Sequence, residues 1–411
     1  MVIHYKKLYQ YILIYLVVIM QGSVLFITYQ DPILLLSLLI AFVFCLKHWK
    51  SIKNDINFII VVLLALSLLT EVFYTKGSLS IPSVLNILAK FLISVTAVYY
   101  NKKDFCDRYV RLVVFLSLCS LIIYCIQLFD YNLISSLLPR IERSGTNYYG
   151  LIFGSVVDWH KTRNIGLSGE PGRHQIYLIT AMYFLLYKGK MIHAEEKKKT
   201  RYFIVLLITM LTAGSTTGFI SLIILIGGFM LKINGTTDSK RFYRNIRTIL
   251  ILACVVLCIY YIYTGEDNFI YRNFVSKLFN TSGKLDVMVS TGRSRTISML
   301  TDWKLALQNP LGMGYTNYER LWSISKVEYI SDLSSCCGIT MALATLGFHN
   351  VFLILIFYIY NARRNSDSII DFFVLIGILL NNAFSQTSIY FTPILVMFLV
   401  NKNLGDTTNE S

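Results

Sequence analysis

The sequence predicts an all-α fold, a polytopic membrane helical bundle of about 12 transmembrane helices with two large extracytoplasmic loops. Hydrophobic residues make up 55% of the 411 residues and charged residues only 15%, whereas soluble domains carry about 25% charged residues. A bilayer core requires about 20 apolar residues per helix. The apolar stretches that we assign as spans cover residues 8-28, 32-46, 57-73, 81-100, 112-129, 175-187, 202-214, 217-231, 248-263, 337-360, 368-383 and 388-400.

The distribution of Lys and Arg supports this order of spans. Short cytoplasmic loops retain positive charge. The predicted connecting segments form two sets, one on each side of the membrane. The set that includes both termini holds 23 Lys and Arg in 76 residues, and the other set holds 14 in 132 residues. We therefore expect both termini in the cytoplasm and the two long loops outside. The net charge of +15 is explained by the cytoplasmic loops and adjacent anionic lipid, so it does not indicate nucleic-acid binding.

This topology divides the chain into five regions. Five N-terminal transmembrane helices occupy 1-129, the first large loop 130-174, helices six to nine 175-263, the second large loop 264-336, and three C-terminal helices with a cytoplasmic tail 337-411.

The stretch 202–231 allows two interpretations, because its two spans of 13 and 15 residues are shorter than usual. A single long helix is the alternative. Basic residues flank both ends of the stretch, which favours a hairpin, with a break at Gly214 to Gly218 near the outer face.

The first large loop carries the most concentrated charge. Arg163 and Gly166 precede Glu170, Arg173 and His174, just where the chain re-enters apolar sequence. An arginine offers a planar fork that binds phosphate bidentately, and beside a membrane the ligand would be a lipid-linked phosphate or pyrophosphate. The alternatives are solvated loop charges, or ion pairs in which Glu170 only neutralises Arg163. A carboxylate at Glu170 could also take a proton from an attacking hydroxyl.

The spacing of apolar residues in the second large loop predicts two short amphipathic helices, near 269–280 and 294–308. Ser294 could cap the second helix, with Arg293 and Arg295 at its start. Cations are unfavourable at a helix N-terminus. A bound anion would relieve that conflict, although a pair of arginines at a helix start is weak evidence alone.

One cation falls inside a predicted span. Lys90 is costly there unless it faces a cavity or an anionic partner, and we include it among the candidate substrate-binding residues. The outer loops contain no Asp-x-Asp metal clamp and no zinc spacing. We therefore expect neither a metal nor a cofactor.

Three features together carry a family resemblance: twelve spans, the motif Arg163-x-x-Gly166-x-x-x-Glu170 at the end of one outer loop, and Arg293 with the run Pro310 to Gly314 in the other. In these features the chain resembles the O-antigen polymerase (Wzy) and O-antigen ligase superfamily. The resemblance covers the topology and local motifs over about a tenth of the chain. It implies a GT-C-like fold and a metal-independent, inverting glycosyltransferase in the bacterial cytoplasmic (inner) membrane, acting at the outer, periplasmic face.

In the polymerase reading, the donor is a growing O-antigen or capsule-type chain on undecaprenyl pyrophosphate. The acceptor is a sugar hydroxyl of another undecaprenyl-pyrophosphate-linked repeat unit. Arg163 and Arg293 match the arginines that the family uses around the donor pyrophosphate; we place Glu170 with them as catalytic, and Gly166, Arg173, His174, Arg295 and Lys90 as substrate-binding. The implied partners are membrane lipid, a chain-length regulator and a flippase.

Family ligases carry a catalytic histidine just before the span that follows the second loop. The residues there run from Ser331 to Cys337 without a histidine, and His349-Asn350 falls later, where we expect helix interior. This favours the polymerase over the ligase. The general base stays open among Glu170, His174 and Asp332, and a transporter or flippase for lipid-linked sugars is the alternative from another class.

Overall fold

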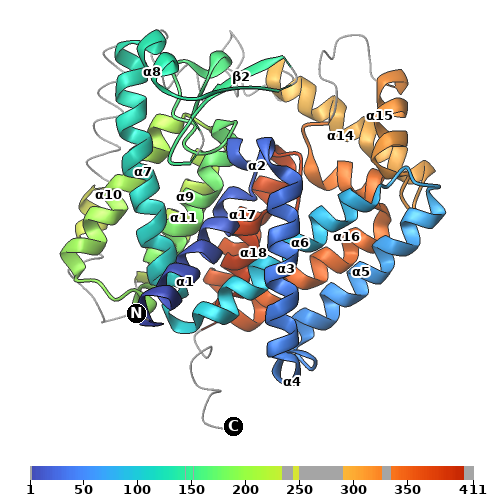
Figure 1. Cartoon of the computed structure of the whole chain (residues 1–411), viewed down its shortest axis with the longest axis horizontal. Helices are drawn as coiled ribbons and strands as arrows, with labels where there is room; N and C mark the ends of the chain where they lie inside the picture. Colours follow the sequence, from blue (N-terminus) through green and yellow to red (C-terminus); the bar gives the residue numbers. More distant parts are fainter. Residues whose placement is uncertain are drawn as a thin grey trace.

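A computed structural model of the chain describes residues 2–143, 145–150, 152–233, 244–249, 290–325 and 335–401. Within these residues the fold is a bundle of helices with one small sheet (Figure 1). The long helices are α1 (Val2–Ile19), α3 (Gln30–Lys47), α5 (Ile56–Tyr74), α6 (Ile81–Asn101), α7 (Phe105–Phe129), α9 (Pro171–Tyr187), α10 (Glu196–Ala213), α11 (Thr216–Ile233), α16 (Gly338–Asn365) and α17 (Ile369–Ser385). The shorter α18 (Thr392–Leu399) follows.

Several helices have the length and apolarity that a bilayer requires. Among the described residues, four stretches are long and apolar enough to cross a membrane: Gln30–Lys47, Ile56–Tyr74, Ile81–Phe129 and Gly338–Asn365. Large apolar side chains on them face outward, Phe42 at 61% exposure and Phe73 at 82%, as lipid contact requires. The chain is therefore a helical membrane protein. The count of twelve spans and the GT-C-like arrangement stay predictions, and the span predicted at 248–263 lies almost entirely outside the described residues.

The centre of the bundle is built from α9 and α18. Every residue of α18 is buried, and so is every residue of α9 except two in its first turn. The surrounding helices α1, α6, α7, α10, α11, α16 and α17 contact one or both of them. Because α9 follows the first large loop directly, that loop is anchored to one of the two most buried helices in the described part of the chain.

The connecting segments gather at two opposite ends of the bundle. Asn361 donates to Asn57 at 2.6 Å and Arg111 to the carbonyl of His193 at 3.1 Å, which joins segments predicted for the basic side. At the other end Val24 N–H donates to Leu167 O at 2.9 Å. The alternation of the predicted loops and the assignment of one end to the cytoplasm stay predictions.

The hairpin predicted within 202–231 is confirmed. α10 and α11 are separate helices, and Gly214 between them adopts a left-handed conformation with φ 60°. A residue with a side chain is unfavourable at such an angle, so the glycine ends α10 and reverses the chain.

The first large loop contains β-structure that the all-α prediction missed. After α8 (Tyr131–Leu137), strands β1 (Arg140–Arg143), β2 (Thr146–Tyr149) and β3 (Val156–Val157) form an antiparallel sheet in the order β1-β2-β3. A 3-10 helix (η2, Asp158–His160) follows. In Figure 1 the sheet covers the upper side of the bundle, together with α8, α14 and α15.

The first predicted span is interrupted near its outer end. α1 stops at Ile19, and a turn of residues 20–23 leads into the short helix α2 (Val24–Thr28). Gly22 has φ 104°, and a Cβ there would lie 2.4 Å from Nη1 of Arg173. The turn therefore needs glycine for its backbone angle and for close approach to Arg173.

The second large loop is described from residue 290 to 325. α14 (Ser290–Gln308) begins at Ser290, so the prediction that Ser294 caps this helix is wrong, and Ser294 lies inside it. The predicted helix 269–280 lies outside the described residues. α15 (Gly314–Ser325) follows a turn at residues 309–313.

A buried carboxylate joins α14 and α15 to α16. Asp302 accepts hydrogen bonds from the hydroxyls of Tyr318 at 2.6 Å and Thr340 at 2.8 Å and is fully buried. Burial raises the pKa of Asp302 to about 6, while its hydrogen bonds oppose that shift. Leu305, Trp322 and Ala344 complete a small apolar cluster around this junction.

α16 is not continuous. Gly347 has φ 77° and ψ 164°, and Phe348 N–H donates to Pro310 O at 3.0 Å. The expectation that His349 and Asn350 lie in helix interior is therefore only partly right, because they begin the second half of a broken helix. Asn350 there donates to Glu71 of α5 at 2.6 Å.

Candidate functional site: a cationic cavity beside the first outer loop

A cavity of about 360 Å³ opens between the turn after α1, the face of α6, the first large loop and the segment before α18. Three cations line it, Lys90, Arg143 and Arg173, and its described lining contains no carboxylate. The other lining residues are Met20, Gln21, Gly22, Phe26, Ile27, Gln30, Asn86, Thr387, Ser388, Tyr390 and Phe391. Such a lining favours an anionic ligand.

Lys90 extends from α6 between two aromatic rings. Its Nζ lies 5.0 Å from the ring centroid of Tyr390 and 5.8 Å from that of Phe26. Cation–π contacts of this kind hold an ammonium group without neutralising it. Among the described residues, no carboxylate forms an ion pair with Lys90. The charge that we identified as costly in a span therefore does face a cavity.

Arg173 enters the cavity from the first turn of α9. Its Nε lies 3.8 Å from Oε2 of Glu170, whose side chain is 42% exposed. A pair this long and this accessible to solvent is weak. Arg173 therefore retains capacity to bind an anion, while Glu170 lies behind it and is not among the residues that line the cavity.

Loop 163–169 is held in place by buried polar contacts. Asn164 donates to Thr212 Oγ1 at 3.2 Å and to Ser120 Oγ at 3.3 Å. Nδ1 of His174 lies 3.0 Å from the carbonyl oxygen of Asn164. Gly166 has φ 55°, and a Cβ there would lie 2.3 Å from the Tyr177 hydroxyl. This loop thereby fixes the start of α9, and with it Arg173.

Two residues that we predicted to bind substrate belong to this scaffold. His174 is fully buried, packs on Tyr177, and does not line the cavity. Gly166 is buried and does not line it either. We predicted substrate contacts for them because they lie close to Arg173 in the chain. In the structure they support the loop, so His174 is not retained as a candidate base.

Arg163, one of the two arginines that carry the family resemblance, does not line this cavity. Arg163 follows η2 and is half-buried, its carbonyl accepts from Gln127 Nε2 at 3.3 Å, and burial lowers its pKa. Arg295 is exposed on α14. The backbone of Arg293 is in the first part of α14, but its side chain lies outside the described residues, as does all of Asp332.

A second cavity of about 350 Å³ adjoins the first. The two share Ile27, Gln30 and Arg143, and the second adds Asp31 and Glu142. Arg143 therefore stands at the boundary between a cationic space and a space with carboxylates.

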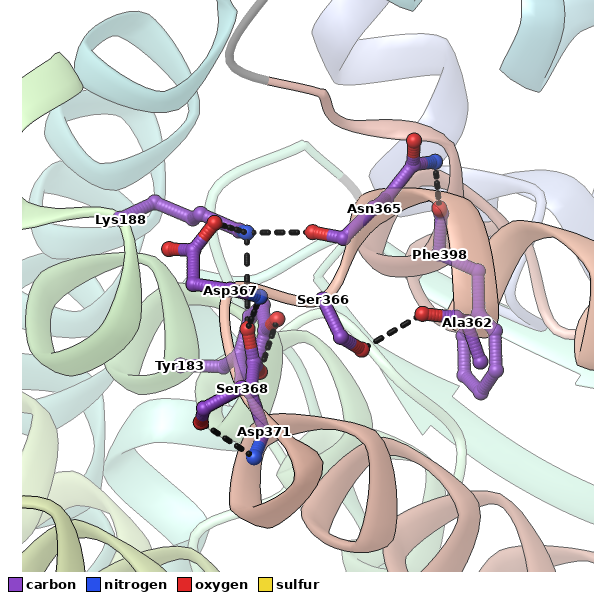
Figure 2. A network of polar contacts seen from close by, with 9 residues as sticks. All are labelled: Tyr183, Lys188, Ala362, Asn365, Ser366, Asp367, Ser368, Asp371 and Phe398. Atoms are coloured by element: carbon purple, nitrogen blue, oxygen red, sulfur yellow. Dashed lines mark hydrogen bonds and ion pairs between the residues drawn. The ribbon is translucent and has the colours of Figure 1, made fainter.

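A cluster of buried charge lies at the other end of α9 (Figure 2). Nζ of Lys188 is 3.4 Å from Asp367 Oδ1 and 3.6 Å from Asp371 Oδ2, and it donates to Asn365 O at 2.7 Å. The Tyr183 hydroxyl donates to Asp371 at 2.7 Å. About 15 residues of helix, at about 1.5 Å each, separate this cluster from Arg173. It joins α9 to α17, and its residues line neither of the two cavities described above.

The sequence identified Lys90 and Arg173 but not the residues around them. Arg143, Gln21, Asn86 and Tyr390 were not identified as site residues. Asn86 and Lys90 are four residues apart in a helix and so share one face, a signal that could have been used. Gln21 is a polar residue at the end of an apolar stretch, which is the other available signal.

No family model and no curated protein matches the chain. Among the described residues, no group of three or more His, Cys, Asp or Glu could hold a metal ion.

Proposed function

We propose that the chain is a membrane glycosyltransferase that polymerises lipid-linked repeat units. It transfers a glycan chain from undecaprenyl pyrophosphate to a sugar hydroxyl of a second lipid-linked unit, at the outer face of a bacterial cytoplasmic membrane. The observation that carries the proposal is the cationic cavity, since it presents Lys90, Arg143 and Arg173 and no lining carboxylate. The resemblance in topology and loop motifs supports the choice of this reaction.

In this proposal the cavity holds the pyrophosphate of the donor. The acceptor hydroxyl loses its proton to a base, which stays open between Glu170 and Asp332, and its oxygen attacks the anomeric carbon. The bond from that carbon to the pyrophosphate oxygen breaks, and the configuration inverts. Negative charge grows on the departing lipid pyrophosphate. Preorganised cations at that position stabilise the transition state, and losing one such group costs about 100- to 1000-fold in rate.

Surface glycans of the native cell test the proposal. Lys90→Met and Arg173→Met are compared with a clean deletion and with Arg140→Met, a matched control whose arginine is 59% exposed and lines neither cavity. We expect the deletion and both cavity variants to replace the long glycan ladder with single repeat units, and the control to keep it. Arg163→Ala and Arg293→Ala in the same series test the arginines that the resemblance identifies.

Other patterns of surface and lipid-linked glycans would identify a different function. Long lipid-linked chains that accumulate unattached would make the chain a ligase. Repeat units trapped on the cytoplasmic face would make it a flippase. A normal ladder in the deletion would exclude both the polymerase and these alternatives.

A further inference from the structure

The cavity contains polar groups that an anion alone does not use. Gln21 is 4% exposed, and neither Nε2 nor Oε1 of its side chain has a hydrogen-bond partner among the described residues. Oδ1 of Asn86 is buried and also unpartnered there. Both residues line the cavity that holds Lys90 and Arg173. A buried polar group without a partner is expensive, and native proteins keep few of them.

Gln21 is placed there by the turn after α1. The N–H groups of Gly22 and Ser23 donate to Ile19 O at 3.2 and 3.0 Å, and Val24 N–H donates to Leu167 O. These contacts tie the turn to α1 on one side and to the first large loop on the other. Gly22 packs against the guanidinium of Arg173. The amide of Gln21 and the charge of Arg173 therefore belong to one fixed unit.

Asn86 reaches the same space from α6. It precedes Lys90 by four residues, which puts the two side chains on one helix face a turn apart. The cavity thus has cations from α6, α9 and β1, and amide groups from the turn after α1 and from α6. Gln21 offers a donor, Nε2, beside an acceptor, Oε1, and Asn86 offers a further acceptor, Oδ1.

A group that both donates and accepts hydrogen bonds satisfies this set. Phosphate oxygens only accept, so they cannot serve Gln21 Oε1 or Asn86 Oδ1. The hydroxyls of a sugar ring both donate and accept. A sugar joined directly to the bound phosphate would bring its hydroxyls to the amides while the cations hold the anion.

We propose that Gln21 and Asn86 recognise the hydroxyls of the sugar that is attached to the bound phosphate, which makes them specificity-determining residues for the donor. The proposal rests on the proposed function, because it takes the cationic cavity as the pyrophosphate site. The ligand class is a glycosyl phosphate or pyrophosphate, and the part that is recognised is the first sugar.

The test measures binding to the purified full-length protein in nanodiscs by calorimetry. The probes are inorganic pyrophosphate and inorganic phosphate for the anion alone, and the 1-phosphates of glucose, galactose and N-acetylglucosamine for the sugar. The variants are Gln21→Met and Asn86→Leu, which keep the side-chain size and remove the polar groups. Gln175→Met is the matched control, because Gln175 is equally buried but donates to Asn382 Oδ1 at 2.7 Å.

We expect at least one sugar 1-phosphate to bind wild type more tightly than inorganic phosphate. Gln21→Met and Asn86→Leu should lower that affinity by at least about tenfold, with pyrophosphate affinity unchanged within about twofold. A second readout is the thermal midpoint of the free protein. It should stay equal or rise in Gln21→Met, because an unpartnered buried amide is removed, and fall in Gln175→Met, which breaks existing hydrogen bonds.

The other results overturn the inference in separable ways. If pyrophosphate binds but no sugar 1-phosphate binds better than phosphate, sugar recognition is excluded and the anion site stands. If Gln21→Met weakens all probes equally, the amide serves the anion. If the thermal midpoint of Gln21→Met falls as far as that of Gln175→Met, Gln21 has a structural role. If wild type binds neither pyrophosphate nor any sugar phosphate, the proposed function itself fails.

Discussion

Replacing Lys188 by methionine should destabilise the protein strongly. Lys188 and Asp371 are both 0% exposed, and Asp367 is 15% exposed. At an effective dielectric constant of about 20, two unit charges about 3.5 Å apart attract by about 5 kcal/mol. Removing one partner of a buried pair costs about 3 to 5 kcal/mol, because the other charge is left uncompensated. Asp371 keeps its hydrogen bonds from Tyr183 and from the N–H of Asp367, so we expect about 3 kcal/mol.

The assay is equilibrium unfolding in mixed micelles with increasing SDS, followed by tyrosine and tryptophan fluorescence. Arg140→Met is the control, because the Arg140–Glu142 pair is 59% and 63% exposed and a surface pair contributes at most about 1 kcal/mol. The double variant Lys188→Met/Asp371→Asn removes both buried charges and should recover part of the loss. A loss for Lys188→Met no larger than that of Arg140→Met would refute the reasoning.

Two further predictions concern stability. Because the pKa of Asp302 is raised to about 6 in the folded protein, the unfolded state releases this proton first. The free energy of unfolding should therefore fall by up to about 3 kcal/mol as pH rises from about 4 to above 6. Unfolding curves measured at several pH values should show this decrease in wild type and no such decrease in Asp302→Asn. Gly166→Ala should lower the free energy of unfolding by about 1 to 3 kcal/mol, because the added Cβ would meet Tyr177 and His174 at a φ of 55°. The control is Gly227→Ala in α11, where an added Cβ would have nothing within 4 Å. This control should be neutral or slightly stabilising. Equal midpoints for the two alanine variants would contradict this account.

The helices of this protein were predictable because hydropathy is a local signal. A stretch such as 81–100 is predominantly apolar, and α6 occupies Ile81–Asn101. The α10–α11 hairpin followed from basic residues at both ends of a short apolar stretch. The sheet was missed because its strands have two to four residues, too few for an alternating pattern to show.

The site was predictable only where a residue was unusual in its own segment. Lys90 was identified because a cation in an apolar span requires an explanation. Tyr390 could not be found in this way, since it is an ordinary interface residue by sequence and its contact with Lys90 joins positions 300 residues apart. His174 was misassigned for the opposite reason, because closeness to Arg173 along the chain says nothing about the direction in which a side chain points.

The break at Gly347 lies where α16 meets two apolar clusters. Ala344 packs in the small cluster with Leu305 and Trp322, while Ala342 and Leu346 of the same half pack in the main core, as Val351 and Ile354 of the second half do. A helix normally transmits order along its ladder of backbone hydrogen bonds, and this ladder is interrupted here. The first half of α16 therefore couples the small cluster to the main core through side-chain packing alone, and hydrogen exchange there should be faster than in the second half.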